Sequence, residues 1–216
     1  MTERILNLIK ENYPLTEVPC GEFAEMKVRG MKFSIRAYRA EGLGHVSVMR
    51  ATAMMGLMKM DTLIINPTEI DLPLYSYDRI FAMGNDTLIV ELYDTTFDKF
   101  DESKLMAALA GEKYAAIPER DPGEHWYDSI KLKSSISKKC KKAQTSLMNT
   151  LADQHFNAYL DTKVAVVTDK AEKQKKSRVY VDGLITKGGP STDVFKKAIG
   201  EALTRQLFEE KLFGTK

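Results

Sequence analysis

Between residues 31 and 94 the sequence contains five strand-like segments joined by short connections, and this succession restricts the fold more than any other feature. Apolar and polar residues alternate over 31–38, as in a strand with one buried face. Parallel neighbours would need crossover connections of about a dozen residues or more. The connections here are shorter, so the sequence predicts an antiparallel meander. Its other strands are expected at 45–52, 60–66, 75–83 and 87–94, with turns at 41–44 and 84–86.

Helical patterns lie on both sides of this strand region. Helices are expected at 2–12, 102–110, 137–160 and 192–212. The charged stretch 163–178 is expected to be a mobile loop, and 179–185 a short strand or extended segment. Strands followed by helices indicate an α+β fold, in which helices pack on one antiparallel sheet. No repeat or break in composition divides the chain, so a single domain over 1–216 is expected.

Composition excludes several classes of protein. No apolar run approaches the roughly 18 residues of a membrane helix, and the N-terminal residues lack a signal-peptide core. We therefore expect a cytoplasmic protein without a membrane partner. Cys20 and Cys140 lie too far apart to suggest a disulfide framework or a metal site. The histidines show no metal spacing, and no Walker or Rossmann glycine pattern is present, so no bound cofactor is expected.

Asp78 is the strongest candidate for chemistry. Pro67 and Pro73 lack the N–H groups that strand pairing requires, so a loop separates the strand before them from the one that carries Asp78. Tyr75 and Tyr77 give this aspartate apolar neighbours. Burial disfavours the charged form of a carboxyl group and raises its pKa, which would let it donate a proton near neutral pH. The alternative is a strand-end carboxylate that faces solvent.

The string formed by Pro67, Leu72-Pro73-Leu74-Tyr75 and Asp78, followed by a hairpin, resembles the core motif of the ferredoxin-dependent bilin reductases. Phycocyanobilin:ferredoxin oxidoreductase belongs to that family, and red chlorophyll catabolite reductase is related to it. The C-terminal stretch 194–213 is also similar, so the chain looks like a divergent bacterial member. The resemblance implies an α/β/α sandwich with a central antiparallel sheet flanked by helices. It also implies reduction of a linear tetrapyrrole, with a proton from Asp78 and single electrons from an external ferredoxin or flavodoxin.

Three departures from the family pattern leave a second function open. Ser76 replaces a glycine of the motif, the stretch 62–65 lacks a histidine that phycocyanobilin:ferredoxin oxidoreductase has, and Gly189 stands where several members have an aspartate. The alternative function is a binding protein of the same fold that holds a tetrapyrrole or haem breakdown product without reducing it.

Several further residues are candidates for binding the substrate. Arg50, Arg36 and Lys32 lie on neighbouring predicted strands and could bind the two propionates of a linear tetrapyrrole, although an arginine that only snorkels to the rim is the alternative. Tyr75 and Tyr77 would surround Asp78, and His45 is a possible acid–base partner. The methionines at 49, 54, 55, 58 and 60 could line a flat pocket or simply fill the core.

Two basic clusters could bind a partner. The first lysine cluster consists of Lys131, Lys133, Lys138, Lys139, Lys141 and Lys142, and the second of Lys170, Lys173, Lys175, Lys176 and Arg178. A net charge of +2 and the lack of a recognition motif disfavour nucleic acid. The resemblance suggests that these clusters steer an acidic electron-transfer protein toward the pocket. A solvated surface is the alternative.

Overall fold

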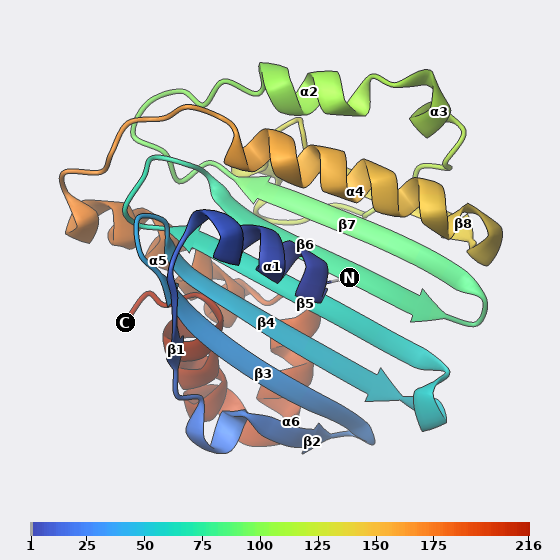
Figure 1. Ribbon diagram of the computed structural model, residues 1–216. Coiled ribbons are helices and arrows are strands. Elements are labelled where there is room, and N and C mark those ends of the chain that lie inside the picture. The colour runs from blue at the N-terminus through green and yellow to red at the C-terminus, as the bar shows by residue number, and fades with distance from the viewer. Residues whose placement is uncertain (1) are drawn as a thin grey trace.

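The computed structural model describes residues 2–216, and an eight-stranded antiparallel sheet forms its centre (Figure 1). The strands follow the spatial order β1-β3-β4-β5-β6-β7-β8, while β2 pairs with the remaining length of β3. The bounds are β1 Leu15–Val18, β2 Glu25–Val28, β3 Met31–Ala40, β4 Gly44–Ala53, β5 Met58–Pro67, β6 Leu74–Ala82, β7 Asn85–Tyr93 and β8 Ile136–Lys141. The predicted meander is confirmed from β3 to β7.

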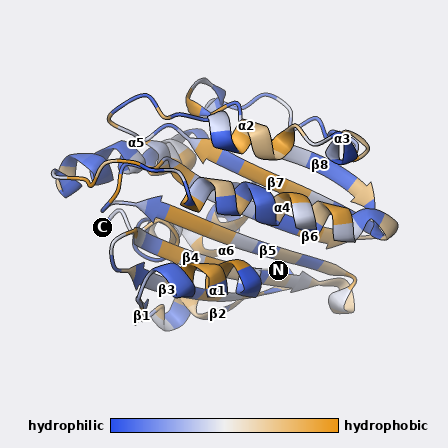
Figure 2. Ribbon diagram, turned by 45° about the horizontal axis from the view of Figure 1, so that its top comes forward, coloured by the Kyte–Doolittle hydropathy of each residue, from blue (hydrophilic) through white to orange (hydrophobic). Residues whose placement is uncertain are grey.

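Helices cover both faces of the sheet (Figure 1). One face packs against α1 (Thr2–Asn12) and α4 (Thr145–Leu160), with α2 (Ser103–Leu109) and α3 (Glu112–Ala115) beside α4. The other face packs against α5 (Lys170–Lys187), α6 (Pro190–Gln206) and the π-helix η5 (Leu207–Leu212). The predicted α/β/α sandwich is therefore confirmed. Figure 2 shows hydrophobic and hydrophilic residues interleaved along the strands.

The predicted long helix at 137–160 is wrong in its first part. Residues 136–141 form β8, which pairs with β7, and α4 begins only at Thr145. Ile136, Lys138 and Cys140 are buried at every second position, which is the period of a strand. The exposed edge of β7 offers N–H and C=O groups that need partners, and this long-range pairing overrides the local helical spacing.

The predicted loop at 163–178 is wrong from residue 170 on, and the predicted strand at 179–185 is wrong throughout, because residues 170–187 form the helix α5. Asp169 caps it by accepting a hydrogen bond from the backbone N–H of Glu172. The buried side begins with Lys173 and Ser177 and only then continues through Tyr180 and Leu184. Two buried polar residues interrupt the apolar periodicity, so the hydrophobic pattern does not reveal the helix.

The predicted C-terminal helix is confirmed in outline. It begins at Pro190, a residue suited to the first turn, and breaks at Gly200, whose φ of 81° and ψ of 166° are not helical. Among residues 2–216 no helix is long and apolar enough to cross a membrane. The expectations of a single domain over 1–216 and of a cytoplasmic protein stay predictions.

Candidate functional site

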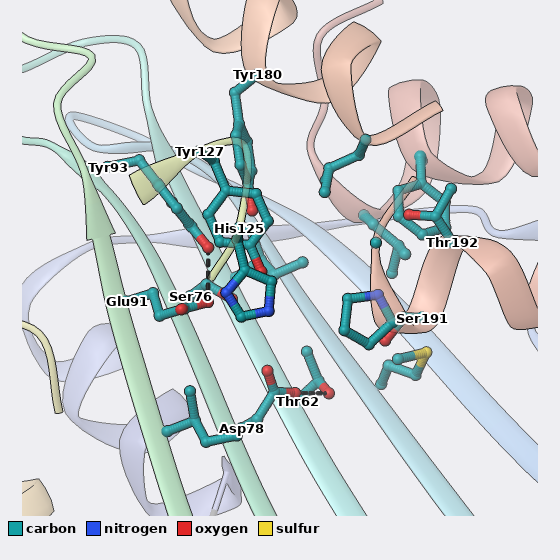
Figure 3. Close-up of a pocket in the computed structure, with 18 of the residues that line it drawn as sticks. Thr62, Ser76, Asp78, Glu91, Tyr93, His125, Tyr127, Tyr180, Ser191 and Thr192 are labelled. Carbon is teal, nitrogen blue, oxygen red and sulfur yellow. Dashed lines mark hydrogen bonds between the residues drawn. The ribbon is translucent and has the colours of Figure 1, made fainter. Parts of the chain in front are cut away.

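A cavity of about 260 Å³ lies between the sheet and the α5, α6 and η5 layer (Figure 3). Its floor comes from β4 to β7, and its roof from these helices together with the segment 120–127. The floor residues are Met49, Met60, Thr62, Ile64, Ser76, Asp78, Ile80, Ile89, Glu91 and Tyr93. Most of the lining is apolar, so the few polar groups would decide how a ligand is oriented.

Asp78 sits in the middle of this floor because of the register of four strands. Met49 of β4 pairs with Thr62 of β5, Thr62 with Asp78 of β6, and Asp78 with Ile89 of β7. Directly paired residues point to the same face of a sheet. The four side chains therefore form one row across the cavity floor, with the carboxyl group between a hydroxyl and an aliphatic side chain.

The environment of Asp78 favours its protonated form. Burial raises the pKa of Asp78 from 3.8 to about 6; a hydrogen bond donated by the Thr62 hydroxyl lowers it, and the charge of Glu91 raises it. The accessible part of the side chain faces the cavity. A carboxyl group of this kind exchanges a proton close to neutral pH, as a general acid requires.

Glu91 is a second carboxylate on the same floor. It pairs with Ser76, so it is a diagonal neighbour of Asp78, about 7–8 Å away along the sheet. Its Oε2 accepts a hydrogen bond from the Tyr93 hydroxyl at 2.6 Å, and Lys131 Nζ lies 3.8 Å from its Oε1. Asp78 and Glu91 thus place two carboxyl groups on one cavity floor, and the contacts of Glu91 with Tyr93 and Lys131 hold its side chain in place.

An aromatic cluster closes the Glu91 end of the cavity. The rings of Tyr93 and Tyr180 stack with centroids 4.1 Å apart, and Tyr127 meets both edge-on. Burial raises the pKa of all three tyrosines, which therefore stay neutral hydrogen-bonding groups. The cluster links β7, the 120–127 segment and α5, and it fixes the height of the roof above the floor.

The segment 120–127 brings two nitrogen-rich side chains to the cavity. The His125 ring stacks on Tyr127 at 4.8 Å and points toward the space between Glu91 and Asp78 (Figure 3). The backbone of Arg120 is tied to β8, because its N–H donates to the Ser137 carbonyl at 2.9 Å. Its guanidinium makes a long contact of 3.4 Å to the Ser137 hydroxyl. Among the described residues that line the cavity, Arg120 is the only arginine or lysine.

The comparison with solved structures shows a closely related fold. The chain has the fold of phytochromobilin synthase. The crystal structure of that protein from tomato, in complex with biliverdin, superposes with a TM-score of 0.74 and 16% sequence identity. The match covers 100% of this chain and 83% of the tomato protein. No protein-family model matches the sequence, and no curated protein matches it. The likeness supports the resemblance drawn from the sequence at the level of the fold.

The cations predicted to bind propionates lie on the opposite face of the sheet from Asp78. Arg50 forms ion pairs with Glu3 of α1 at 3.0 Å and with Asp61 at 3.7 Å. Arg36 pairs with Glu17 at 3.4 Å, and Lys32 lies on the same face of β3. Met49, not Arg50, points into the cavity, because successive residues of a strand face opposite ways. Arg50, Arg36 and Lys32 therefore do not line the cavity that contains Asp78, and their predicted role in binding substrate stays a prediction.

Tyr75 and Tyr77 also point away from the cavity, because they alternate with Ser76 and Asp78 along β6. Both are fully buried, and Tyr75 packs on Phe156 and Tyr159 of α4, across the sheet from the cavity. His45 is structural instead of an acid–base partner. Its Nε2–H donates to the Lys211 carbonyl at 2.8 Å, and burial lowers its pKa, so it stays neutral and ties down the C-terminal segment.

The residues that the sequence did not indicate are Thr62, Glu91, Arg120 and the three tyrosines. Glu91 could have been found from the hairpin between β6 and β7. Met83 and Gly84 both have positive φ and form a two-residue turn, which sets Ser76 opposite Glu91. A three-residue turn at 84–86, as predicted from the sequence, would instead pair Glu91 with Arg79 and send Glu91 to the other face.

Proposed function

We propose that the protein reduces a linear tetrapyrrole bound in this cavity, with Asp78 as the proton donor. The observation that carries the proposal is an enclosed carboxyl group, with a pKa of about 6, that faces the cavity in a fold shared with a bilin-bound enzyme. Reduction of one double bond takes up two electrons and two protons. Asp78 supplies one proton, and His125, an imidazole on the cavity wall, is our candidate for the second.

The geometry suggests how a flat ligand would lie. Its rings would rest on the row formed by Met49, Thr62, Asp78 and Ile89, and pyrrole N–H groups would donate to Glu91. The volume is close to the lower end of ordinary ligand sites, about 300–1,000 Å³. A whole tetrapyrrole would therefore extend past the exposed lining residues Pro190 and Ser191, toward solvent.

Arg120 is our candidate for binding a substrate carboxylate in this cavity, which the three cations named above do not line. A guanidinium binds a carboxylate in a bidentate manner. The Arg120→Gln variant is expected to raise KM for biliverdin and leave KM for its dimethyl ester unchanged. An equal loss for both compounds would contradict this role.

The electrons are proposed to come from an external ferredoxin or flavodoxin. Only some members of the two basic clusters can contact such a partner. Lys173 is fully buried and Lys138 nearly so, and both are paired with carboxylates, so they cannot take part. The exposed Lys133 and Lys139 of the first lysine cluster remain candidates for the docking surface.

An anaerobic assay tests the proposal. Biliverdin, ferredoxin, ferredoxin reductase and NADPH are mixed with the protein, and the bilin absorbance is followed. The wild type and the Asp98→Asn control, which removes an exposed carboxylate, are expected to change the spectrum at the same rate. The Asp78→Asn variant is expected to be slower by 100-fold or more, as for the loss of a general acid, on the order of 10²–10⁴. A spectrum that stays constant with the wild type would refute the proposal.

The second candidate is a binding protein of the same fold. The observation that favours it is Gly189 in the cavity lining, at the position where the family resemblance puts an aspartate in several members. A binding protein would shift the bilin spectrum on mixing, and the supply of electrons would cause no further change.

A further inference from the structure

The hairpin turns at one end of the sheet carry large apolar side chains that contact little of the protein. Met54, Met55 and Leu57 lie in the turn between β4 and β5, and Met83 lies in the turn between β6 and β7. Their exposed fractions are 57% for Met54, 68% for Leu57 and 82% for Met83, and Met55 is fully exposed. Because Met58 pairs with Ala82, the two turns lie side by side, at the right of Figure 1. We call these four residues the hairpin tips.

Packing does not explain why methionine occupies these positions. Met54, Met55 and Met83 all have φ close to +50°, a conformation that glycine, asparagine or aspartate adopts more readily. Side chains that are exposed and also held in a strained backbone contribute little to the core. A contiguous exposed apolar group of this kind is typical of a surface that meets another phase or partner.

The same end of the sheet is strongly basic. Lys27 pairs with Lys32, Lys32 with Thr52, and Thr52 with Lys59, so three lysines share one cross-strand row. Two lysines directly opposite each other destabilise a sheet, and among residues 2–216 no ion pair to a carboxylate involves any of the three. Besides Lys138, which is buried and paired with Glu119, the segments at this end, 26–33, 51–60, 80–87 and 138–143, contain seven lysines and arginines. Their one acidic residue, Asp86, is buried against Arg79.

We propose that this end of the sheet binds the surface of an anionic lipid membrane. The hairpin tips enter the boundary between headgroups and acyl chains, and the lysine row contacts the lipid phosphates. Leu57 lies two residues beyond Lys59, so the tips extend about 7 Å past the lysines. That depth matches the roughly 5–10 Å to which peripheral proteins bury apolar groups. The two turns that carry the tips project from the end of the sheet (Figure 1), a shape that suits a deformable bilayer. The proposal concerns a surface outside the cavity and is independent of the proposed reduction.

Vesicle flotation tests the proposal with the full chain. The wild type is expected to bind phosphatidylcholine vesicles that contain phosphatidylserine, and not vesicles of phosphatidylcholine alone. The double variant Met55→Asp/Met83→Asp is expected to lose binding. Replacing Lys27 and Lys59 by glutamine is expected to weaken it about fivefold per lysine and to reduce its salt sensitivity. The matched control is Val166→Asp, which changes another exposed apolar residue, in the connection between α4 and α5, and is expected to bind as the wild type does.

Several results would overturn the proposal. These are no binding of the wild type to the anionic vesicles, equal binding to neutral vesicles, or the same loss for Val166→Asp as for the tip variant. The tips could instead be required for self-association or for binding an acidic ferredoxin, with no binding to vesicles. That result would assign this surface to a protein partner. Circular dichroism of each variant shows whether the fold is kept, and the lysine variant, which alters exposed side chains only, keeps the test decisive if a tip variant fails to fold.

Discussion

The hydrogen bond from Thr62 to Asp78 offers the sharpest test of how the cavity sets the acidity of its central carboxyl group. Burial raises the pKa of Asp78 to about 6, and the Thr62 hydroxyl opposes this effect by donating to the carboxylate. The Thr62→Val variant keeps the shape of the side chain and removes the donor. A hydrogen bond to a charged group is worth about 1.5–3 kcal/mol, and 1.36 kcal/mol corresponds to one pH unit. The titration midpoint of Asp78 is therefore expected to rise by about one to two pH units, toward pH 7–8.

Carbon-13 NMR of the aspartate carboxyl carbons measures this midpoint without reference to any activity, and Asp78→Asn identifies the signal. If the proposed reduction occurs, the rate of the wild type should fall as pH rises through about 6, because the protonated acid is lost. The Thr62→Val variant should hold its rate to higher pH. A midpoint that stays in place or moves down would refute the reasoning, because the hydroxyl would then not be stabilising the charged form.

Three further predictions concern stability and packing. The pKa of Asp78 rises from 3.8 to about 6 on folding, so the native state binds this proton more tightly than the unfolded chain and loses stability as pH rises through that range. Asp78→Asn is therefore expected to raise the free energy of unfolding near pH 7–8 by at most about 3 kcal/mol. It should also flatten the pH dependence of that free energy between about pH 4 and 6, and urea denaturation measures both effects. Lys173 is fully buried and donates to Asp71, so Lys173→Met should lower the free energy of unfolding by about 3–5 kcal/mol. Lys175 forms an exposed ion pair with Glu172, and Lys175→Met should change that free energy by less than about 0.5 kcal/mol. A Cβ at Gly183 would lie 2.1 Å from the Trp126 ring, so Gly183→Ala should displace the one tryptophan into solvent and red-shift its fluorescence. This is expected although alanine stabilises an isolated helix over glycine by about 0.5–1 kcal/mol. An unchanged emission spectrum would contradict this packing.

Local sequence signals predicted the parts of the fold whose stability is local. The strands β3 to β7 follow from alternation and short turns, and α1 and α6 from apolar periodicity and helix-ending residues. Asp78 was found because two prolines set its strand apart and because the string around it resembles a family motif; the residues alone left a solvent-facing carboxylate open. The failures occurred where a distant partner decides the structure. β8 forms because β7 needs a neighbour, and α5 is hidden because its buried side includes Lys173, whose ammonium group is satisfied by groups far away in the sequence.

The sequence by itself determined that a carboxyl group would stand on a strand of an antiparallel sheet. Only the tertiary structure decided which residues share its face. Side chains alternate from one face to the other along a strand, so an error of one residue in register exchanges the two sets completely. Arg50 and Tyr77 are each one step from a cavity residue and lie on the far side of the sheet, whereas Thr62 and Glu91 meet Asp78 because hydrogen bonding between strands aligns them. The acidity of Asp78 likewise depends on the helices that close the cavity, since they remove the water that would otherwise stabilise its charge.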